Sequence, residues 1–152
     1  SIGLIVSKKL KLDFVDIDEK IEKELGTKIS EIFKTNGENY FRNIEEKITL
    51  KMLKKTNTVI SLGGGAFLNK NIKKVILDNH LSFWLNWNTK TLVNRIKNNQ
   101  KRPLAYNMKV NDLIELIKKR SKIYSRALYK VQCENCTKNE IVKKIIDTYE
   151  AH

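Results

Sequence analysis

The sequence contains few of the residues that cross-link a chain or bind metals. Its 152 residues include one proline, two cysteines and two histidines. Two cysteines fit an intracellular protein. Cys133 and Cys136 form a Cys-x-x-Cys pair, but zinc needs two further ligands, and histidine occurs only at positions 80 and 152. We therefore expect an ordinary pair at a strand end, with redox or metal use as the alternative.

Long hydrophobic runs and acidic residues are also scarce. No apolar run is long enough to span a bilayer, and the amino end has no signal-peptide core, so we expect a soluble cytoplasmic protein without a membrane partner. Thirty Lys plus Arg against 17 Asp plus Glu give a formal charge of +13. This excess favours anionic partners, but the lysines are spread along the chain. A nucleic-acid-binding domain is an alternative that lacks interleaved aromatics and a recognised motif, and we expect no nucleic-acid partner.

Hydrophobic periodicity indicates one α/β domain over residues 1–152. The pattern predicts helices over 2–10, 17–25, 27–33, 38–54, 69–78, 89–97, 111–127 and from 138, and strands over 11–17, 58–62, 80–86 and 129–133. Alternating strands and helices predict a three-layer α/β/α sandwich with a mainly parallel sheet. Length and composition indicate no second domain.

Local signals mark a lid and two helix starts. Residues 98–103 are polar, break the periodicity and include the only proline, so we expect a mobile lid over about 99–110. The pair Asn111–Asp112 is expected to cap the helix that follows. Thr137 and Glu140 match a capping box ahead of the closing helix.

Half of the six glycines follow one apolar strand. Gly63, Gly64 and Gly65 come directly after the strand over 58–62. Glycine permits positive φ and close backbone approach, and ligands bind at the carboxyl edge of open α/β sheets. A phosphate cradle is one interpretation, although no Gly-Lys-Ser follows. A tight turn in which glycine serves geometry only is the alternative.

Two aspartates end the strand over 11–17. Asp16 and Asp18 lie two residues apart where the chain breaks into a helix, so both are expected to face the same way. Such carboxylates can hold a divalent cation or accept a proton from a substrate hydroxyl. Helix capping by aspartate is the alternative.

Three arginines could bind anions. Arg42 and Glu45 lie three apart on one predicted helix, which suits either a surface ion pair or an arginine fork held for a carboxylate or phosphate. Arg102 is either a solvated loop residue or a lid arginine that neutralises a transferring phosphoryl group. Arg120, taken singly, is indistinguishable from the bases beside it.

The order of these motifs resembles that of one enzyme family. An Asp-x-Asp pair, Gly-Glu-x-x-Phe-Arg-x-x-Glu, Leu-Gly-Gly-Gly-Ala, Arg-Pro-Leu and Arg-x-x-x-Tyr follow one another at the spacing of shikimate kinases. The resemblance runs from Ser1 to about Tyr124. It implies a small kinase of the P-loop, nucleoside-monophosphate-kinase type that moves the γ-phosphate of ATP to the 3-hydroxyl of shikimate, in the chorismate pathway of aromatic amino acid biosynthesis.

The resemblance also implies residue roles, with ATP, Mg²⁺ and shikimate as partners and a monomeric state. Asp18 matches the aspartate that activates the acceptor hydroxyl, and Asp16 the carboxylate beside magnesium. Arg42 and Arg120 match the pair that grips the shikimate carboxylate. The remaining matches are Gly63, Gly64 and Gly65 as the floor of the acceptor pocket and Arg102 as the catalytic lid arginine that reaches the ATP phosphates.

One part of the family pattern is missing from these residues. The sequence contains no G-x-x-x-x-G-K-[ST], which in the family immediately precedes the position of Ser1. We therefore expect a chain that has lost its first strand and P-loop, that has a slot in its sheet, and that is inactive by itself. A non-catalytic relative that serves as a binding module is the alternative, and another acceptor such as gluconate is a third. The adenine-contacting arginine has no clear match, and Lys138 is a candidate.

Overall fold

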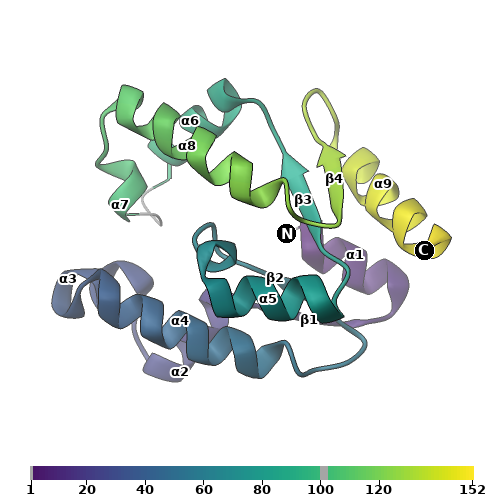
Figure 1. Ribbon diagram of the computed structural model, residues 1–152, viewed down its shortest axis with the longest axis horizontal. Helices are drawn as coiled ribbons and strands as arrows, with labels where there is room; N and C mark the ends of the chain where they lie inside the picture. Colours follow the sequence, from purple (N-terminus) through teal and green to yellow (C-terminus); the bar gives the residue numbers. More distant parts are fainter. Residues whose placement is uncertain (1, 100–102) are drawn as a thin grey trace.

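The computed structural model describes residues 2–99 and 103–152 (Figure 1). The elements follow the chain as α1 (Ile2–Leu10), β1 (Asp13–Asp16), α2 (Ile17–Leu25), α3 (Ile29–Asn36), α4 (Glu38–Met52), β2 (Thr58–Ser61), the 3₁₀ turn η1 (Ala66–Leu68), α5 (Lys70–Asn79), β3 (Phe83–Asn86), α6 (Thr89–Lys97), α7 (Pro103–Tyr106), α8 (Val110–Tyr124), β4 (Tyr129–Gln132) and α9 (Lys138–Ala151). Strands alternate with helices, as the periodicity predicts.

The helix ends follow local chemistry in most places. Gly26, at φ 67°, ends α2, and Gly37, at φ 85°, separates α3 from α4. Both angles lie in the left-handed region that favours glycine. At α9, the Thr137 side chain accepts from the Glu140 amide and the Glu140 carboxylate accepts from the Thr137 amide, which confirms the predicted capping box.

The lid region differs from the expectation in two respects. A short helix, α7, begins at Pro103 inside the segment expected to be a loop. Proline suits this first helical position because its fixed φ is helical and its missing N–H would have no partner there. The helix α8 begins at Val110 after Lys109, which makes no side-chain capping bond, so the prediction that Asn111–Asp112 caps this helix is wrong.

The strands pair in parallel, but they do not form one sheet. β1 pairs with β2, which places Asp16 opposite Ser61, and β3 pairs with β4, which places Trp84 opposite Lys130. Among the described residues no ladder joins the two pairs, because β2 and β3 each have a single neighbour. The expectation of parallel strands is confirmed, and the described strands form two separate pairs. The division falls between the pairs that contain β2 and β3, where a slot is expected.

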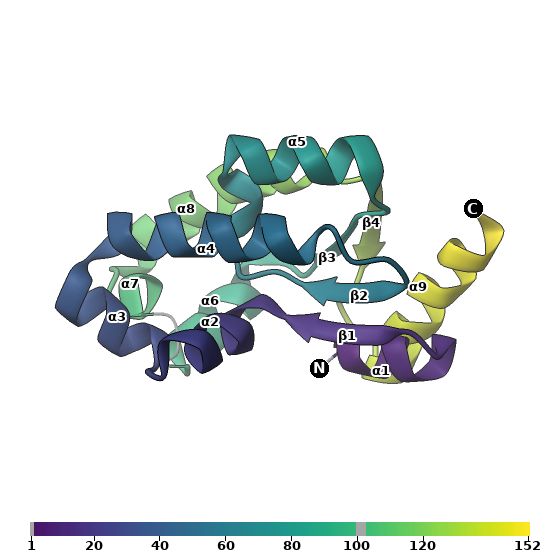
Figure 2. The ribbon, with the colours of Figure 1, turned by 90° about the horizontal axis from the view of Figure 1, so that it is seen from below.

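Helices pack against both faces of these strands (Figure 2). Val59 of β2 packs against a cluster of α1, β4 and α9 that includes Val6 and Val142. Its neighbour Ile60 faces the other way and packs against clusters built from α2, α4, η1 and α5. Adjacent strand residues point to opposite faces, so the apolar residues of β2 pack against clusters on both sides and are partly buried.

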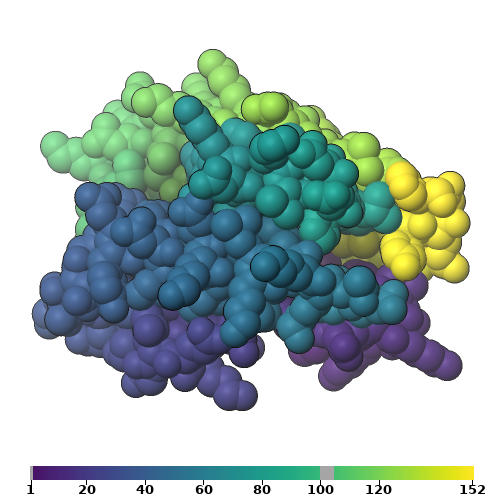
Figure 3. Space-filling view, turned by 60° about the horizontal axis from the view of Figure 1, so that its bottom comes forward, coloured from purple at the N-terminus to yellow at the C-terminus, as the bar shows by residue number. Residues whose placement is uncertain are grey.

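The parallel pairing of β1 and β2 positions the site. Their carboxyl ends lie together, so the start of α2 and the glycine loop leave the sheet at the same edge. α3 and α9 lie at opposite ends of the long axis, and Figure 3 shows the face on which α4 and α5 lie between them. The chain segments before α2 and after β2 can therefore contribute to one site beside α4.

Candidate functional site

The two aspartates after β1 have different roles in the structure. Asp16 is the N-cap of α2, and its Oδ1 accepts from the Glu19 amide at 3.2 Å. Asp18, in the first turn of α2, lines a cavity beside the glycine loop. The expectation that both carboxylates face the same way is therefore not met: Asp16 makes the helix cap that was its alternative, whereas Asp18 reaches the cavity. As the N-cap, Asp16 turns its carboxylate back toward the helix amides, whereas Asp18 in the first turn of α2 lines the cavity.

Arg42 is held by carboxylates on its own helix. Its Nη1 donates to Glu45 Oε1 at 2.8 Å, and its Nη2 lies 3.6 Å from Glu38 Oε2. The Glu45 side chain is only 3% exposed. Because a buried carboxylate needs a cation or donors, this contact is more than an ordinary surface ion pair. Glu45 fixes the guanidinium of Arg42 at the cavity wall.

The glycine loop leaves room for both charged groups. A Cβ at Gly63 would lie 2.9 Å from Asp18 Oδ1, and one at Gly65 would lie 2.7 Å from Arg42 Cζ. Gly65 has φ −96°, so any residue could adopt its backbone angle. For these two positions the expected close approach is observed and the expected positive φ is not. A side chain at Gly65 would displace the Arg42 guanidinium, which occupies that space.

Arg120 reaches the same cavity from α8. Its Nε is buried and has no hydrogen-bond partner within the part of the chain that the structure describes. A buried N–H without a partner is costly, so this atom requires an acceptor that residues 2–99 and 103–152 do not provide.

These residues converge on one cavity of about 250 Å³. Its lining joins polar groups and glycines to an apolar wall from α3, α4, α7 and α8: Asp18, Ile29, Phe33, Glu38, Phe41, Arg42, Glu45, Gly63, Gly64, Gly65, Ala105, Met108, Leu116 and Arg120. A few convergent polar groups in an apolar hollow are typical of a small-molecule site. Two guanidinium groups, one of them already neutralised by Glu45, suit a ligand with a carboxylate.

The apolar wall was not predicted from the sequence. Phe33 and Phe41 stack with ring centroids 4.7 Å apart, and Met108 and Leu116 line the cavity as well. Helical periodicity marks such residues as buried but does not say whether they face a core or a hollow. The wall offers dispersion contacts to the carbon atoms of a compact ligand.

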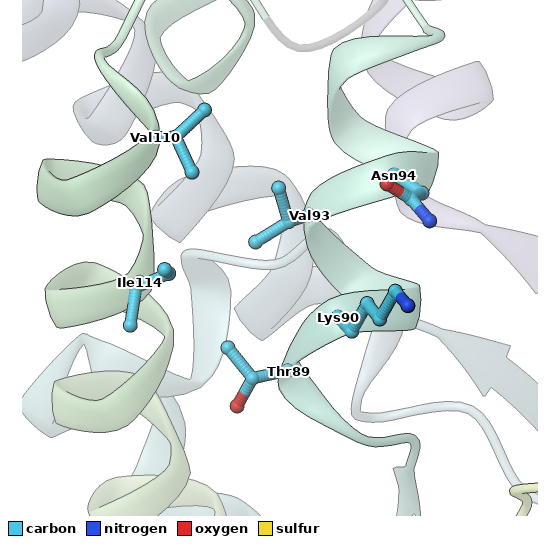
Figure 4. Close-up of a pocket in the computed structure, with 6 residues that line it drawn as sticks. All are labelled: Thr89, Lys90, Val93, Asn94, Val110 and Ile114. Carbon is cyan, nitrogen blue, oxygen red and sulfur yellow. The ribbon is translucent and has the colours of Figure 1, made fainter.

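A second hollow, of about 390 Å³, lies between α6 and α8 (Figure 4). Figure 4 shows Val93, Val110 and Ile114 lining it from the two helices. It is larger than the first cavity, but Lys90 is its only charged lining residue among those described, and none of the predicted site residues borders it. The smaller cavity is the better candidate site because convergent polar groups fix a ligand's orientation and volume alone does not.

Other predicted features lie elsewhere. Arg102 is outside the described residues, and Lys138 begins α9. Cys133 is buried and Cys136 half-buried, and within the described ranges no three His, Cys, Asp or Glu side chains gather as a metal site. In those same ranges no helix is both long and apolar enough to cross a membrane.

Comparison with known proteins identifies the family. The family model of shikimate kinase matches residues 1–150. The chain belongs to the shikimate kinase family. Among curated relatives, it is 38% identical over 151 residues to shikimate kinase of Thermodesulfovibrio yellowstonii (99% of this chain, 87% of the relative). It is 34% identical over 156 residues to that of Bacillus subtilis (97% and 81%).

Solved structures of the family share the fold. The shikimate kinase of Aquifex aeolicus superposes with a TM-score of 0.88 at 31% identity, covering 99% of this chain and 88% of that one. The Acinetobacter baumannii enzyme, in complex with shikimate, superposes with a TM-score of 0.91 at 23% identity, covering 99% and 85%. The predicted α/β fold with parallel strands is thereby confirmed.

Family membership confirms the enzyme class that the ordered motifs predict. The chain is a member of a family of kinases of aromatic amino acid biosynthesis, and this membership implies ATP as phosphate donor.

Proposed function

We propose that this protein transfers the γ-phosphate of ATP to the 3-hydroxyl of shikimate, and that the 250 Å³ cavity holds shikimate. The observation that carries the proposal is the convergence of Asp18, Arg42 and Arg120 on one hollow. The Nε of Arg120 supports the proposal, because this buried donor has no hydrogen-bond acceptor among the described residues and a ligand could provide one.

Arg42 and Arg120 bind the shikimate carboxylate in this proposal. They come from α4 and α8, and both line the cavity, so a carboxylate between them receives donors from both. The Glu45 carboxylate orients the guanidinium of Arg42. This lowers the conformational entropy that Arg42 loses when shikimate binds. The aromatic pair of Phe33 and Phe41 contacts the ring carbons.

Asp18 is the proposed acceptor of the hydroxyl proton. As the 3-hydroxyl oxygen attacks the γ-phosphorus, its proton passes to the Asp18 carboxylate, a P–O bond forms and the bond from the γ-phosphorus to the bridging oxygen of ADP breaks. Gly63 lies against the carboxylate of Asp18, so the glycine loop and the proton acceptor border the substrate together. Gly63, Gly64 and Gly65 form the floor on which the cyclohexene ring of shikimate rests.

Magnesium and the ATP phosphates are assigned to two further residues. Asp16 fits a metal because Mg²⁺ in kinases takes only one or two carboxylates beside phosphate and water, and one hydrogen bond to Glu19 leaves oxygen lone pairs for a bound water. When bound, Mg²⁺ neutralises phosphate charge. Arg102 is the proposed lid arginine at the phosphates, carried over from the resemblance and the Arg-Pro-Leu motif.

We also propose that the 152 residues by themselves bind ATP weakly and turn over slowly. Their sequence contains no G-x-x-x-x-G-K-[ST], whose amides and lysine hold phosphates. Isothermal titration with ATP and Mg²⁺, together with an ADP-release assay, measures both quantities. Turnover at a rate ordinary for small-molecule kinases, roughly 1–100 s⁻¹, would contradict this part of the proposal.

Titration of shikimate into Arg42→Ala tests the acceptor assignment. Loss of the guanidinium should weaken shikimate binding by roughly a hundredfold, as expected for a charge-assisted pair, and should change ATP binding much less. Lys47→Ala, an exposed change on the same helix, is the matched control and should change neither affinity. Equal losses of shikimate and ATP affinity in Arg42→Ala would count against the assignment.

A further inference from the structure

The glycine loop is held from a distance by a tyrosine. The Tyr124 hydroxyl, on the last residue of α8, donates a hydrogen bond to the Gly64 carbonyl, 60 positions away in the sequence. The flanking carbonyls are satisfied locally: that of Gly63 accepts from the Ala66 amide at 3.2 Å and that of Gly65 from the Leu68 amide at 3.2 Å. At the middle carbonyl of the loop, by contrast, the donor comes from another element.

The tyrosine ring is itself fixed by packing. Tyr124 joins the core cluster that contains Ala66 and Phe67, and its ring centroid lies 6.1 Å from that of Trp84 on β3. A hydroxyl on a packed aromatic ring has little rotational freedom to lose when it forms a hydrogen bond. The bond therefore fixes the loop against a rigid support.

Two residues on one face of α8 contribute to the cavity. Arg120 and Tyr124 are four residues apart, so they lie one above the other on the helix. Arg120 lines the cavity, and the hydroxyl of Tyr124 connects the glycine loop to the same helix. The separation between cavity floor and guanidinium is thus set by one helical turn.

From these contacts we infer that Tyr124 is a positioning residue for the acceptor: its hydroxyl fixes the Gly63–Gly65 loop at the distance from Arg120 that shikimate requires. Tyr124 is not among the residues that line the cavity, and it acts through Gly64. This inference rests on the proposed function, because it names shikimate as the ligand above the loop.

Tyr124→Phe isolates the hydroxyl, since the phenyl ring keeps the packing in the cluster with Ala66 and Phe67. Without ligand, exchange of the Ala66 and Leu68 amides should become about tenfold faster, because a partly buried carbonyl left unpaired destabilises the loop by an amount of that order. The dissociation constant of shikimate should rise about tenfold for the same reason.

Tyr129→Phe is the matched control. The Tyr129 hydroxyl also makes a side-chain hydrogen bond, to His152 Nδ1, but it lies on β4 and does not line the cavity. Its loss should leave both the loop exchange and the shikimate affinity unchanged. Amide exchange followed by NMR and titration calorimetry of shikimate measure the two quantities in all three proteins.

The outcomes separate this inference from the proposed function. Faster loop exchange together with weaker shikimate binding in Tyr124→Phe supports the positioning role. Unchanged exchange, or faster exchange with unchanged affinity, overturns it. If the unaltered chain fails to bind shikimate, the proposed function fails, and the exchange rates alone then decide whether the hydroxyl holds the loop.

Discussion

Gly65 leaves space that the Arg42 guanidinium fills, so a methyl group there should displace the arginine. In Gly65→Ala the new Cβ would lie 2.7 Å from Arg42 Cζ, and we expect shikimate affinity to fall about tenfold from the overpacking. Gly26→Ala, strained at φ 67° but with open space around its Cβ, should lower stability and leave the affinity unchanged. Calorimetric titration measures the shikimate affinity of both variants. An unaltered affinity in Gly65→Ala would contradict the close contact between Gly65 and the Arg42 guanidinium.

The Glu45 carboxylate is buried and paired with the Arg42 guanidinium, so its charge should contribute both to stability and to the position of Arg42. Glu45→Gln keeps the volume and removes the charge opposite Arg42, so we expect the free energy of unfolding to fall by about 2 kcal/mol and shikimate binding to weaken. Urea denaturation measures the first effect. Asp78→Asn, which breaks the exposed pair with Lys74, is the control and should change little. A Glu45→Gln protein as stable as the control would show that Glu45 does not hold Arg42.

At the residue scale the sequence reveals short-range contacts and hides long-range ones. The contact of Arg42 with Glu45 follows from their spacing of three on a helix. The bond from Tyr124 to Gly64 spans 60 positions, and no periodicity indicates it. The buried Nε of Arg120 depends on what packs around α8, so its missing partner emerges only in three dimensions.

Among the elements, α9 carries a pH-dependent cap. Hydrogen bonds from Thr137 lower the pKa of Glu140, so its charged form is favoured in the folded chain. This contribution is present above the pKa of an unfolded glutamate and is lost as pH falls through the lowered pKa. Glu140→Gln should therefore be less stable than the unaltered chain at pH 7 and should lose that difference in acid. Melting curves at several pH values would contradict the account if the difference stayed constant.

Element type follows from pattern more reliably than element boundaries do. The helices from α1 to α6 and all four described strands appear within a few residues of their predicted ranges because their apolar spacing is regular. The lid region lacks such spacing, so α7 is not predicted and the cap of α8 is assigned to the wrong residues.

At the scale of the whole molecule, the two cysteines differ in burial and should therefore differ in reactivity. Burial raises the pKa of the Cys133 thiol, which lies in the cluster with Val131 and Val142, whereas Cys136 is half-buried. Since the thiolate is the nucleophile, Cys133 should resist iodoacetamide at pH 8 until the chain unfolds. Mass spectrometry of Cys136→Ser, which retains only the buried thiol, measures its labelling. Rapid labelling under native conditions would contradict the burial.

The arrangement of the whole molecule was predicted in part. Alternating elements indicate parallel strands between helices, and the pairs β1–β2 and β3–β4 are parallel. The division into two pairs follows only from comparing the sequence with the family pattern, because each strand's apolar pattern would suit either a continuous or a divided sheet. The cavity itself needs residues from both halves of the chain, on α4 and α8, and no local signal predicts that these two helices border one cavity.

The central claim is that Arg120 and the cavity around it bind the carboxylate of shikimate. The most direct test is titration calorimetry of shikimate and of its uncharged carboxamide, in the unaltered chain, in Arg120→Ala and in the exposed neighbour control Lys119→Ala. We predict that the unaltered chain and Lys119→Ala prefer shikimate by roughly a hundredfold, the size of a charge-assisted pair, and that Arg120→Ala loses most of this preference. An equal preference in all three proteins would contradict the claim.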